Sequence, residues 1–209
     1  MAEPEQDPTK ERTSVVESGV ADPAPLGLAA FALTTFAFSV VNAGLLGEPA
    51  INHFVPLALI YGGLVQLIAG LWEFRNENTF ASTGFCSYGA FWIALGILEI
   101  FARQLGIAEE QVPIALAWTF TAWAIFTLYM WLASWGVNAA LGIVFTLLLA
   151  TFILLAATEF TGSMAIRQTA GWVGIVTAIA AWYVSAADVL NDTYGRTILP
   201  VGPAAGGGH

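Results

Sequence analysis

The chain has 209 residues and a formal net charge of −9; 57% of its residues are hydrophobic and only 10% are charged. So few charges cannot cover the surface of a water-soluble domain of this size, which excludes a soluble globular protein. Six Lys and Arg residues scattered along the chain also exclude the basic patch that nucleic-acid binding requires.

The first 21 residues are polar and acidic, without the apolar central region of a cleavable signal peptide. We expect residues 1–21 to form a disordered, cytosolic tail. Residues 191–209 are predicted to form a second, C-terminal tail that ends in small residues. The part of the chain that folds is therefore expected to be 22–190.

Six hydrophobic stretches fill this central part, and each is long enough to cross a bilayer, which takes about 20 residues of helix. In chain order they cover about 26–46, 52–72, 82–103, 113–132, 138–158 and 170–188. Pro23 and Pro25 suit a helix entrance, where a missing N–H is harmless. We therefore predict an all-α integral membrane protein with six transmembrane helices.

An even number of spans places both termini on one side of the membrane. That side would carry Lys10, Arg12, Arg75 and Arg196, and the opposite side would carry Arg103 and Arg167. Since cytoplasmic loops are enriched in Lys and Arg, we expect a multi-pass protein of the cell membrane with both termini in the cytoplasm.

The sequence shows no set of residues typical of an enzyme active site or of a metal site. His53 and His209 are the only histidines and Cys86 is the only cysteine. They cannot form a histidine or cysteine metal site or a serine–histidine triad. We expect no catalytic activity, no metal and no cofactor.

Polar residues within the spans are the better candidates for function. In the first span Phe31, Thr34 or Thr35, Phe38 and Asn42 follow one another in steps of three or four, which places them on one helical face. That face could line a passage. Tyr61 and Gln66 lie in the second span, where a buried amide needs a partner.

Two alternative interpretations apply to the polar residues of the spans. Asn42 and Gln66 could instead only hydrogen-bond to neighbouring helices. Four carboxylates lie near predicted span ends, where a solvated or paired charge is more common than a proton relay. They are Glu73, Glu99, Glu159 and Asp188.

Three blocks of the sequence resemble the acetate uptake transporter family. The first, DPAPLGLAAF at 22–31, is similar to the Asn-Pro-Ala-Pro-Leu-Gly-Leu signature of the family. The others are YGGLVQLIAGLWEFRNENTFASTGFCSYGAFW at 61–92 and DVLNDTYGRTILPVG at 188–202, with AGW at 170–172. Asp22 departs from the usual Asn; it keeps a capping side chain and adds a charge at the expected pore mouth.

The resemblance implies a six-helix protomer with a central pore, assembled as a homohexamer in membrane lipid. It also implies transport of acetate and, in some members, of succinate or other short carboxylates. Carried over by motif, the narrow hydrophobic constriction of the family would be formed by Phe31, Tyr88 and Leu148. Ala181 falls at a further pore-lining position.

The chemistry of acetate fits these residues. Apolar walls would accept its methyl group, and the Tyr88 hydroxyl, Asn42 and Gln66 would donate hydrogen bonds to its carboxylate. Channel-like conduction and proton symport are both compatible with the sequence. The alternatives are a transporter of ammonia or another small neutral solute, and a membrane sensor or scaffold that transports nothing.

Overall fold

The computed structural model describes residues 19–47, 50–102 and 104–205. The predictions for the remaining residues lie outside this part of the chain. They concern most of the N-terminal tail with Lys10 and Arg12, then Arg103, and last the C-terminal Gly206–Gly208 and His209.

Most of the described residues are helical, and the helices follow one another in this order. They are α1 (Ala24–Asn42), η1 (Ala50–Phe54), α2 (Val55–Leu59), η2 (Ile60–Val65), α3 (Gln66–Arg75), α4 (Thr79–Phe101), η3 (Glu109–Gln111), α5 (Val112–Ser134), α6 (Ala139–Thr161) and α7 (Met164–Tyr194). Six of the helices in this described part are long and apolar enough to span a membrane, with Asn52–Arg75 forming one span from several segments. The prediction of an all-α, six-span membrane protein is confirmed.

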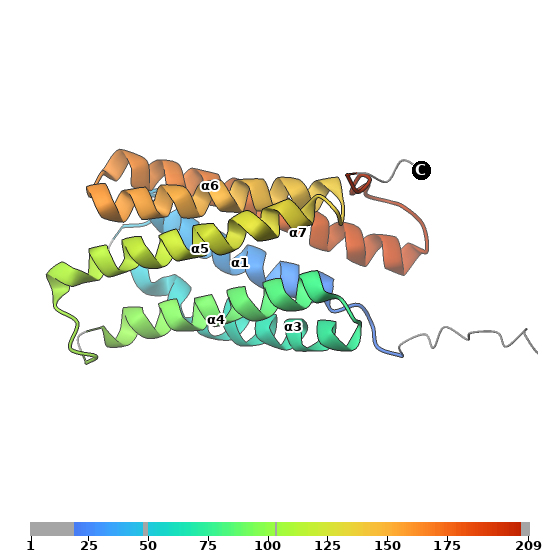
Figure 1. Ribbon diagram of the computed structural model, residues 1–209, viewed down its shortest axis with the longest axis horizontal. Coiled ribbons are helices and arrows are strands. Elements are labelled where there is room, and N and C mark those ends of the chain that lie inside the picture. The colour runs from blue at the N-terminus through green and yellow to red at the C-terminus, as the bar shows by residue number, and fades with distance from the viewer. Residues whose placement is uncertain (1–18, 48–49, 103, 206–209) are drawn as a thin grey trace, which may run out of the picture.

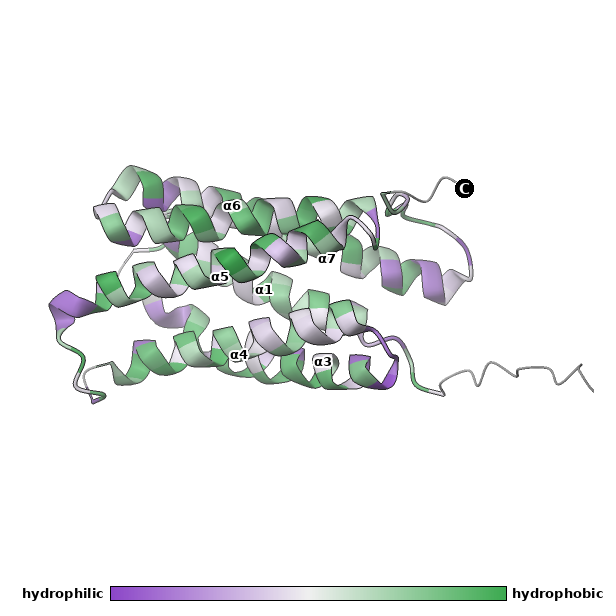
Figure 2. Ribbon diagram, viewed as in Figure 1, coloured by the Kyte–Doolittle hydropathy of each residue, from purple (hydrophilic) through white to green (hydrophobic). Residues whose placement is uncertain are grey.

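The helices run along one long axis, and the beginning of α1 lies at the same end of the bundle as the end of α7 (Figure 1). Hydrophobic residues follow the helices along their length, whereas hydrophilic residues gather at the ends of the bundle and in the connections (Figure 2). This distribution is the one that a bilayer requires of a multi-pass protein.

Local signals set several helix ends. The side chains of Asn78, Asn138 and Ser163 accept hydrogen bonds from the backbone N–H groups at Ala81, Leu141 and Ile166, and so cap α4, α6 and α7. Gly162 and Gly195 end α6 and α7 in the left-handed conformation, with φ of 64° and 60°. Short caps of this kind allow neighbouring helices to pack antiparallel.

Glycines let the helices approach closely. A Cβ atom at Gly171 of α7 would overlap the backbone nitrogen of Ala43, just beyond α1. One at Gly70 of α3 would lie 2.6 Å from the backbone nitrogen of Cys86 in α4. Since water does not drive helices together in a membrane, such contacts between backbones hold the bundle.

The second span contains a π-helical turn, η2, directly before Gln66. A π-turn adds a residue to the helical turn and so rotates the side chains that follow it. The segment is Gly-rich at Gly62 and Gly63, and both glycines are buried.

The first and last helices differ most from the predicted spans. The first helix ends at Asn42, before 46, and the last helix covers Met164–Tyr194, beyond 170–188 at both ends. The last helix is longer because polar turns at water level continue it without a hydrophobic signal, whereas the apolar Leu45 and Leu46 follow α1 outside the helix.

The C-terminal segment differs more from the prediction of a tail over 191–209, because its described residues fold back onto the bundle. Asn191 lies within α7 and not in a tail. Its side chain accepts hydrogen bonds from the N–H groups of Ile198 and Leu199 and donates one to the Leu199 carbonyl. The segment then reaches the α5–α6 connection, where the Ala205 N–H donates to the carbonyl of Trp135 at 2.7 Å.

Candidate functional site

A cavity of about 240 Å³, here called the vestibule, opens inside the bundle at the end where both termini lie. Its volume far exceeds the about 10–15 Å³ that one water molecule needs. Its lining residues come from α1, α3, α4, α6 and α7 and from the connections near them. They are Asp22, Ala24, Leu28, Phe31, Gln66, Asn78, Phe80, Ala81, Gly84, Phe85, Tyr88, Val137, Asn138, Leu141, Val144, Phe145, Leu148 and Asp188.

A second cavity, here called the small cavity, lies further along the bundle. It measures about 20 Å³, which leaves room for about one water molecule. Its wall combines aromatic rings with the hydroxyl groups of Thr35, Ser39, Tyr88 and Thr151. It is lined by Phe31, Thr35, Phe38, Ser39, Tyr88, Phe91, Trp92, Leu148, Thr151, Phe152 and Leu155.

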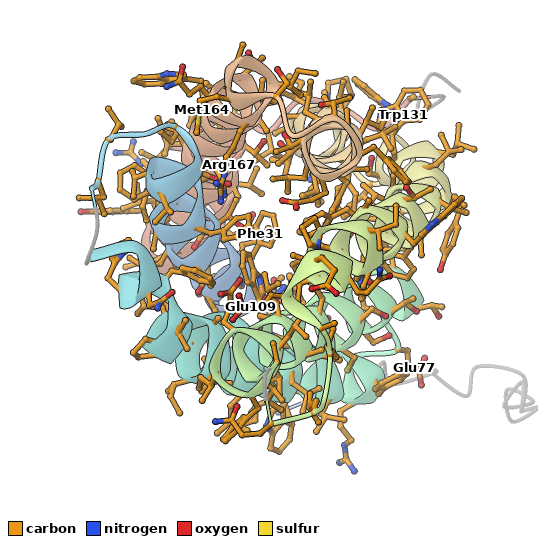
Figure 3. The ribbon with its side chains drawn as sticks, turned by 90° about the vertical axis from the view of Figure 1, so that its left-hand side faces the viewer. Phe31, Glu77, Glu109, Trp131, Met164 and Arg167 are labelled. Atoms are coloured by element: carbon orange, nitrogen blue, oxygen red, sulfur yellow. The ribbon has the colours of Figure 1, made fainter. Side chains whose placement is uncertain are left out.

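Phe31, Tyr88 and Leu148 are the residues that line both cavities. They are 5%, 3% and 4% exposed. The ring centroids of Phe31 and Tyr88 are 6.0 Å apart, and Figure 3 shows Phe31 pointing from α1 toward the middle of the bundle. The structure thus brings together the three residues that the resemblance names for the constriction.

The ring of Tyr88 is held firmly. It stacks on Phe152 and meets Phe126 edge-on, with centroids 6.4 and 5.2 Å away. Its hydroxyl forms a 3.0 Å hydrogen bond with the Thr127 hydroxyl of α5. Tyr88 therefore presents an apolar ring to the cavities, while its hydroxyl is already engaged with a neighbouring helix.

Gln66 is the polar residue of the vestibule wall that is placed best for a ligand. Its side chain is 1% exposed, and neither Oε1 nor Nε2 has a hydrogen-bond partner. A buried amide without partners is destabilising by about 1–3 kcal/mol. Gln66 belongs to the vestibule wall, so its unsatisfied N–H groups and carbonyl oxygen lie beside the cavity, buried behind its surface.

The other predicted site residues lie elsewhere. Asn42 lies at the end of α1, where its side chain bonds to Phe38 and Arg167. Tyr61 is half-buried in η2, and Ala181 is fully buried in the core. Neither Tyr61 nor Ala181 is among the residues that line the two cavities.

The sequence reasoning missed most of the α6 wall. Leu141, Phe145, Thr151 and Leu155 line the cavities together with Leu148. Their spacing of three to four residues about Leu148 is helical and would have identified the whole face.

Carboxylates surround the vestibule at the end where both termini lie. Asp22 and Asp188 belong to its wall. Glu73, for which the sequence favoured a solvated or paired boundary charge, is 1% exposed and its Oε1 has no hydrogen-bond partner, so it is buried and not solvated. Over the described residues, no group of three or more His, Cys, Asp and Glu side chains is arranged to hold a metal ion.

Comparison with known proteins agrees with this arrangement. The succinate-acetate/proton symporter SatP of Escherichia coli K12 is 36% identical over 183 residues, which cover 88% of this chain and 96% of SatP. Ammonia transport outward protein 2 of Saccharomyces cerevisiae is 41% identical over 169 residues, covering 78% of this chain and 59% of that longer protein.

A solved structure of a bacterial acetate channel, SatP, matches the fold with a TM-score of 0.81 and 36% sequence identity. The match covers 88% of this chain and 99% of that one. The resemblance drawn from the sequence is confirmed. Because the family pattern extends over residues 5–204, the chain belongs to the GPR1/FUN34/yaaH family.

Proposed function

We propose that the protein transports acetate and similar short carboxylates across a membrane, along a path inside each protomer. The observation that carries this proposal is the pair of cavities that share Phe31, Tyr88 and Leu148 as a common wall. The names of the SatP relative and of the matching channel structure support the same substrate class.

The vestibule offers acetate both kinds of contact that it needs. Leu28, Val144 and Phe145 supply apolar wall for the methyl group. The unpartnered Nε2 of Gln66 donates a hydrogen bond to the carboxylate and replaces part of the water that the anion loses. Because this contact is single, the site is weak enough for the substrate to leave again.

Phe31, Tyr88 and Leu148 act in this proposal as the constriction. The small cavity beyond them holds about one water molecule, so acetate, with four non-hydrogen atoms, cannot occupy it without side-chain movement. Passage therefore selects by size and by the free energy of removing water from the anion. Larger carboxylates are admitted more slowly.

We also propose that acetate moves together with a proton. Asp22 and Asp188 face the vestibule, and an anion that enters beside them is repelled unless a proton neutralises one of the charges. The relative named as a proton symporter supports this mode. Channel-like conduction of the anion alone is the alternative.

Uptake of radiolabelled acetate into proteoliposomes that contain the purified protein tests the function. We expect uptake faster than in protein-free liposomes, competition by unlabelled succinate, and stimulation by a pH gradient that is acidic outside. Uptake no faster than in protein-free liposomes would overturn the proposal. Uptake that does not respond to the gradient would leave conduction of the anion.

Ammonia is the second candidate, because the ammonia transport outward protein shares 41% identity with this chain. A pH-sensitive dye trapped in the same proteoliposomes reports ammonia entry as alkalinisation. Protein-dependent ammonia entry without acetate uptake would favour this function over the first.

The family resemblance further leads us to propose a homohexamer, with one path in each protomer. Mass photometry in mild detergent would measure its mass. A monomeric particle that still transports acetate after reconstitution would contradict this proposal.

For orientation, we propose that both termini lie in the cytoplasm of the cell. In the described part, Arg75 at the end of α3 and Arg196 just after α7 lie at the end of the bundle where both chain termini lie, and Arg167 of α7 lies at the opposite end. A single cysteine at Ala205, in a chain whose Cys86 is replaced by Ala, should react with an impermeant maleimide only after the cells are opened. Labelling of intact cells would reverse the orientation.

A further inference from the structure

Arg167 lies at the opposite end of the bundle from the vestibule. It belongs to the first turns of α7, whereas Asp188 of the vestibule wall lies near the other end of the same helix, about 30 Å away along the axis. Figure 3, viewed from the Arg167 end, shows Arg167 and Phe31 both pointing toward the middle of the bundle. Arg167 therefore lies where a solute would reach the passage from the far side.

The packing of α7 on α1 puts Arg167 there. Gly171, one turn further along α7, allows the helix to touch the backbone of Asn42 and Ala43. The guanidinium then lies beside the end of α1, where the last carbonyl groups carry partial negative charge and favour a cation.

Asn42 fixes the orientation of the guanidinium. Its side chain is 5% exposed, its Nδ2 donates to the Phe38 carbonyl at 3.0 Å, and its Oδ1 accepts from Arg167 Nε at 3.1 Å. Within the described residues, the Arg167 side chain forms no hydrogen bond other than this one. The two terminal nitrogens remain available to a ligand.

Helix α1 leads from the two cavities toward Arg167. Along α1, Phe31 borders both cavities and Thr35, Phe38 and Ser39 border the small cavity. Asn42 follows one turn beyond Phe38 on the same helix and binds Arg167 directly. Arg167 therefore lies beyond the small cavity, about one helical turn of α1 past Phe38.

Two carboxylates lie within electrostatic range of this cation. Glu99 of α4 and Glu159 of α6 both interact electrostatically with Arg167, although neither forms an ion pair with it in the described part of the chain. Arg75 and Arg196 are exposed, whereas Arg167 is only partly so. An arginine oriented by a buried amide, with nearby carboxylates that do not pair with it, is suited to exchange one carboxylate for another.

We propose that Arg167 is a second carboxylate-binding site, at the far mouth of the passage. The carboxylate of the substrate accepts hydrogen bonds from the two terminal nitrogens, and Glu99 and Glu159 weaken this binding by competing for the same charge. The inference rests on the proposed function for its ligand, a short monocarboxylate or dicarboxylate. The site captures the anion before the constriction removes its water.

The test compares initial rates of acetate uptake from the outside of cells that express the full chain. We expect Arg167→Gln to raise the half-saturating acetate concentration about tenfold, because a charged, bidentate contact is lost. Arg167→Lys keeps the charge without the planar fork and should raise it less. The matched control, Arg196→Gln, removes an exposed arginine at the other end and should leave it unchanged.

The double variant Glu99→Gln and Glu159→Gln should shift the half-saturating acetate concentration in the opposite direction. We expect it to lower the half-saturating concentration about twofold, because the competing charges are removed. A residue that only held the helices together would not produce shifts in opposite directions. An assembled Arg167→Gln protein with unchanged half-saturation, or a double variant that needs more acetate, overturns the proposal.

Binding of ¹³C-acetate to the purified protein, followed by NMR, separates this inference from the proposed function. If the wild-type protein binds acetate through Arg167 but does not transport it, the function fails and the site stands. If transport is present and Arg167→Gln alters neither binding nor uptake, the site fails and the function stands.

Discussion

Replacing Leu148 by Ala tests the constriction, because this side chain separates the two cavities together with two aromatic rings. The change removes three carbon atoms, which corresponds to about 2.4 kcal/mol at about 0.8 kcal/mol for each buried carbon. Leu→Ala changes in cores range from about 2 to 5 kcal/mol. Since Leu148 already borders empty volume, we expect a loss of about 2 kcal/mol in stability, at the lower end of that range.

The effect on selectivity should be larger than the effect on assembly. Shortening the side chain joins the vestibule to the small cavity and relieves the exclusion of a substrate with one more carbon. Lactate exceeds acetate by one carbon and one hydroxyl group, and one methylene group alone changes discrimination by about tenfold, so the ratio of lactate to acetate uptake should rise by about this factor. Paired uptake assays in proteoliposomes, with size-exclusion chromatography for assembly, measure both quantities.

Leu95→Ala is the matched control. Leu95 is 5% exposed against 4% for Leu148, but it lines neither cavity. We expect it to lower stability by at least as much and to leave the lactate-to-acetate ratio unchanged. If assembled Leu148→Ala protein keeps the wild-type ratio, or if Leu95→Ala changes it equally, the constriction assignment is wrong.

Three further predictions concern single residues. Gln66→Leu removes an amide without partners, so thermal melting in detergent should show no loss of stability while acetate uptake falls about tenfold; a large loss of stability would contradict this. Gly171→Ala places a methyl group on the backbone of Ala43 and should lower the yield of folded protein. The control Gly47→Ala has open space at its Cβ and should not lower the yield. Equal yields of the two variants would refute the close contact. Asn191→Ala loses three hydrogen bonds to the C-terminal segment, so a protease should remove this segment faster than from the wild-type chain. Equal cleavage rates of the two chains would contradict this prediction.

The spans, their number and the family were readable from the sequence. Bilayer thickness fixes how many apolar residues a helix needs, and hydropathy is a local property of the chain. The polar turns of α7 were missed because a helix can continue into water where there is no hydrophobic signal, whereas the end of α1 was placed too late because Leu45 and Leu46 are apolar but not helical. Small residues are typical of helix interfaces in membranes, and Gly171 lies at such a close contact.

Which polar residues face a passage was decided only by the tertiary structure. Gln66 and Asn42 look alike in sequence, yet the Gln66 amide is unpartnered beside the vestibule and Asn42 is bonded to Arg167, which lies 125 residues away in the chain. Ala181 and Leu148 are both apolar and buried, but only Leu148 borders the cavities. In a membrane protein the surfaces toward lipid, toward another helix and toward a lumen are all largely apolar, so periodicity cannot distinguish them and only the packing of the helices assigns each face.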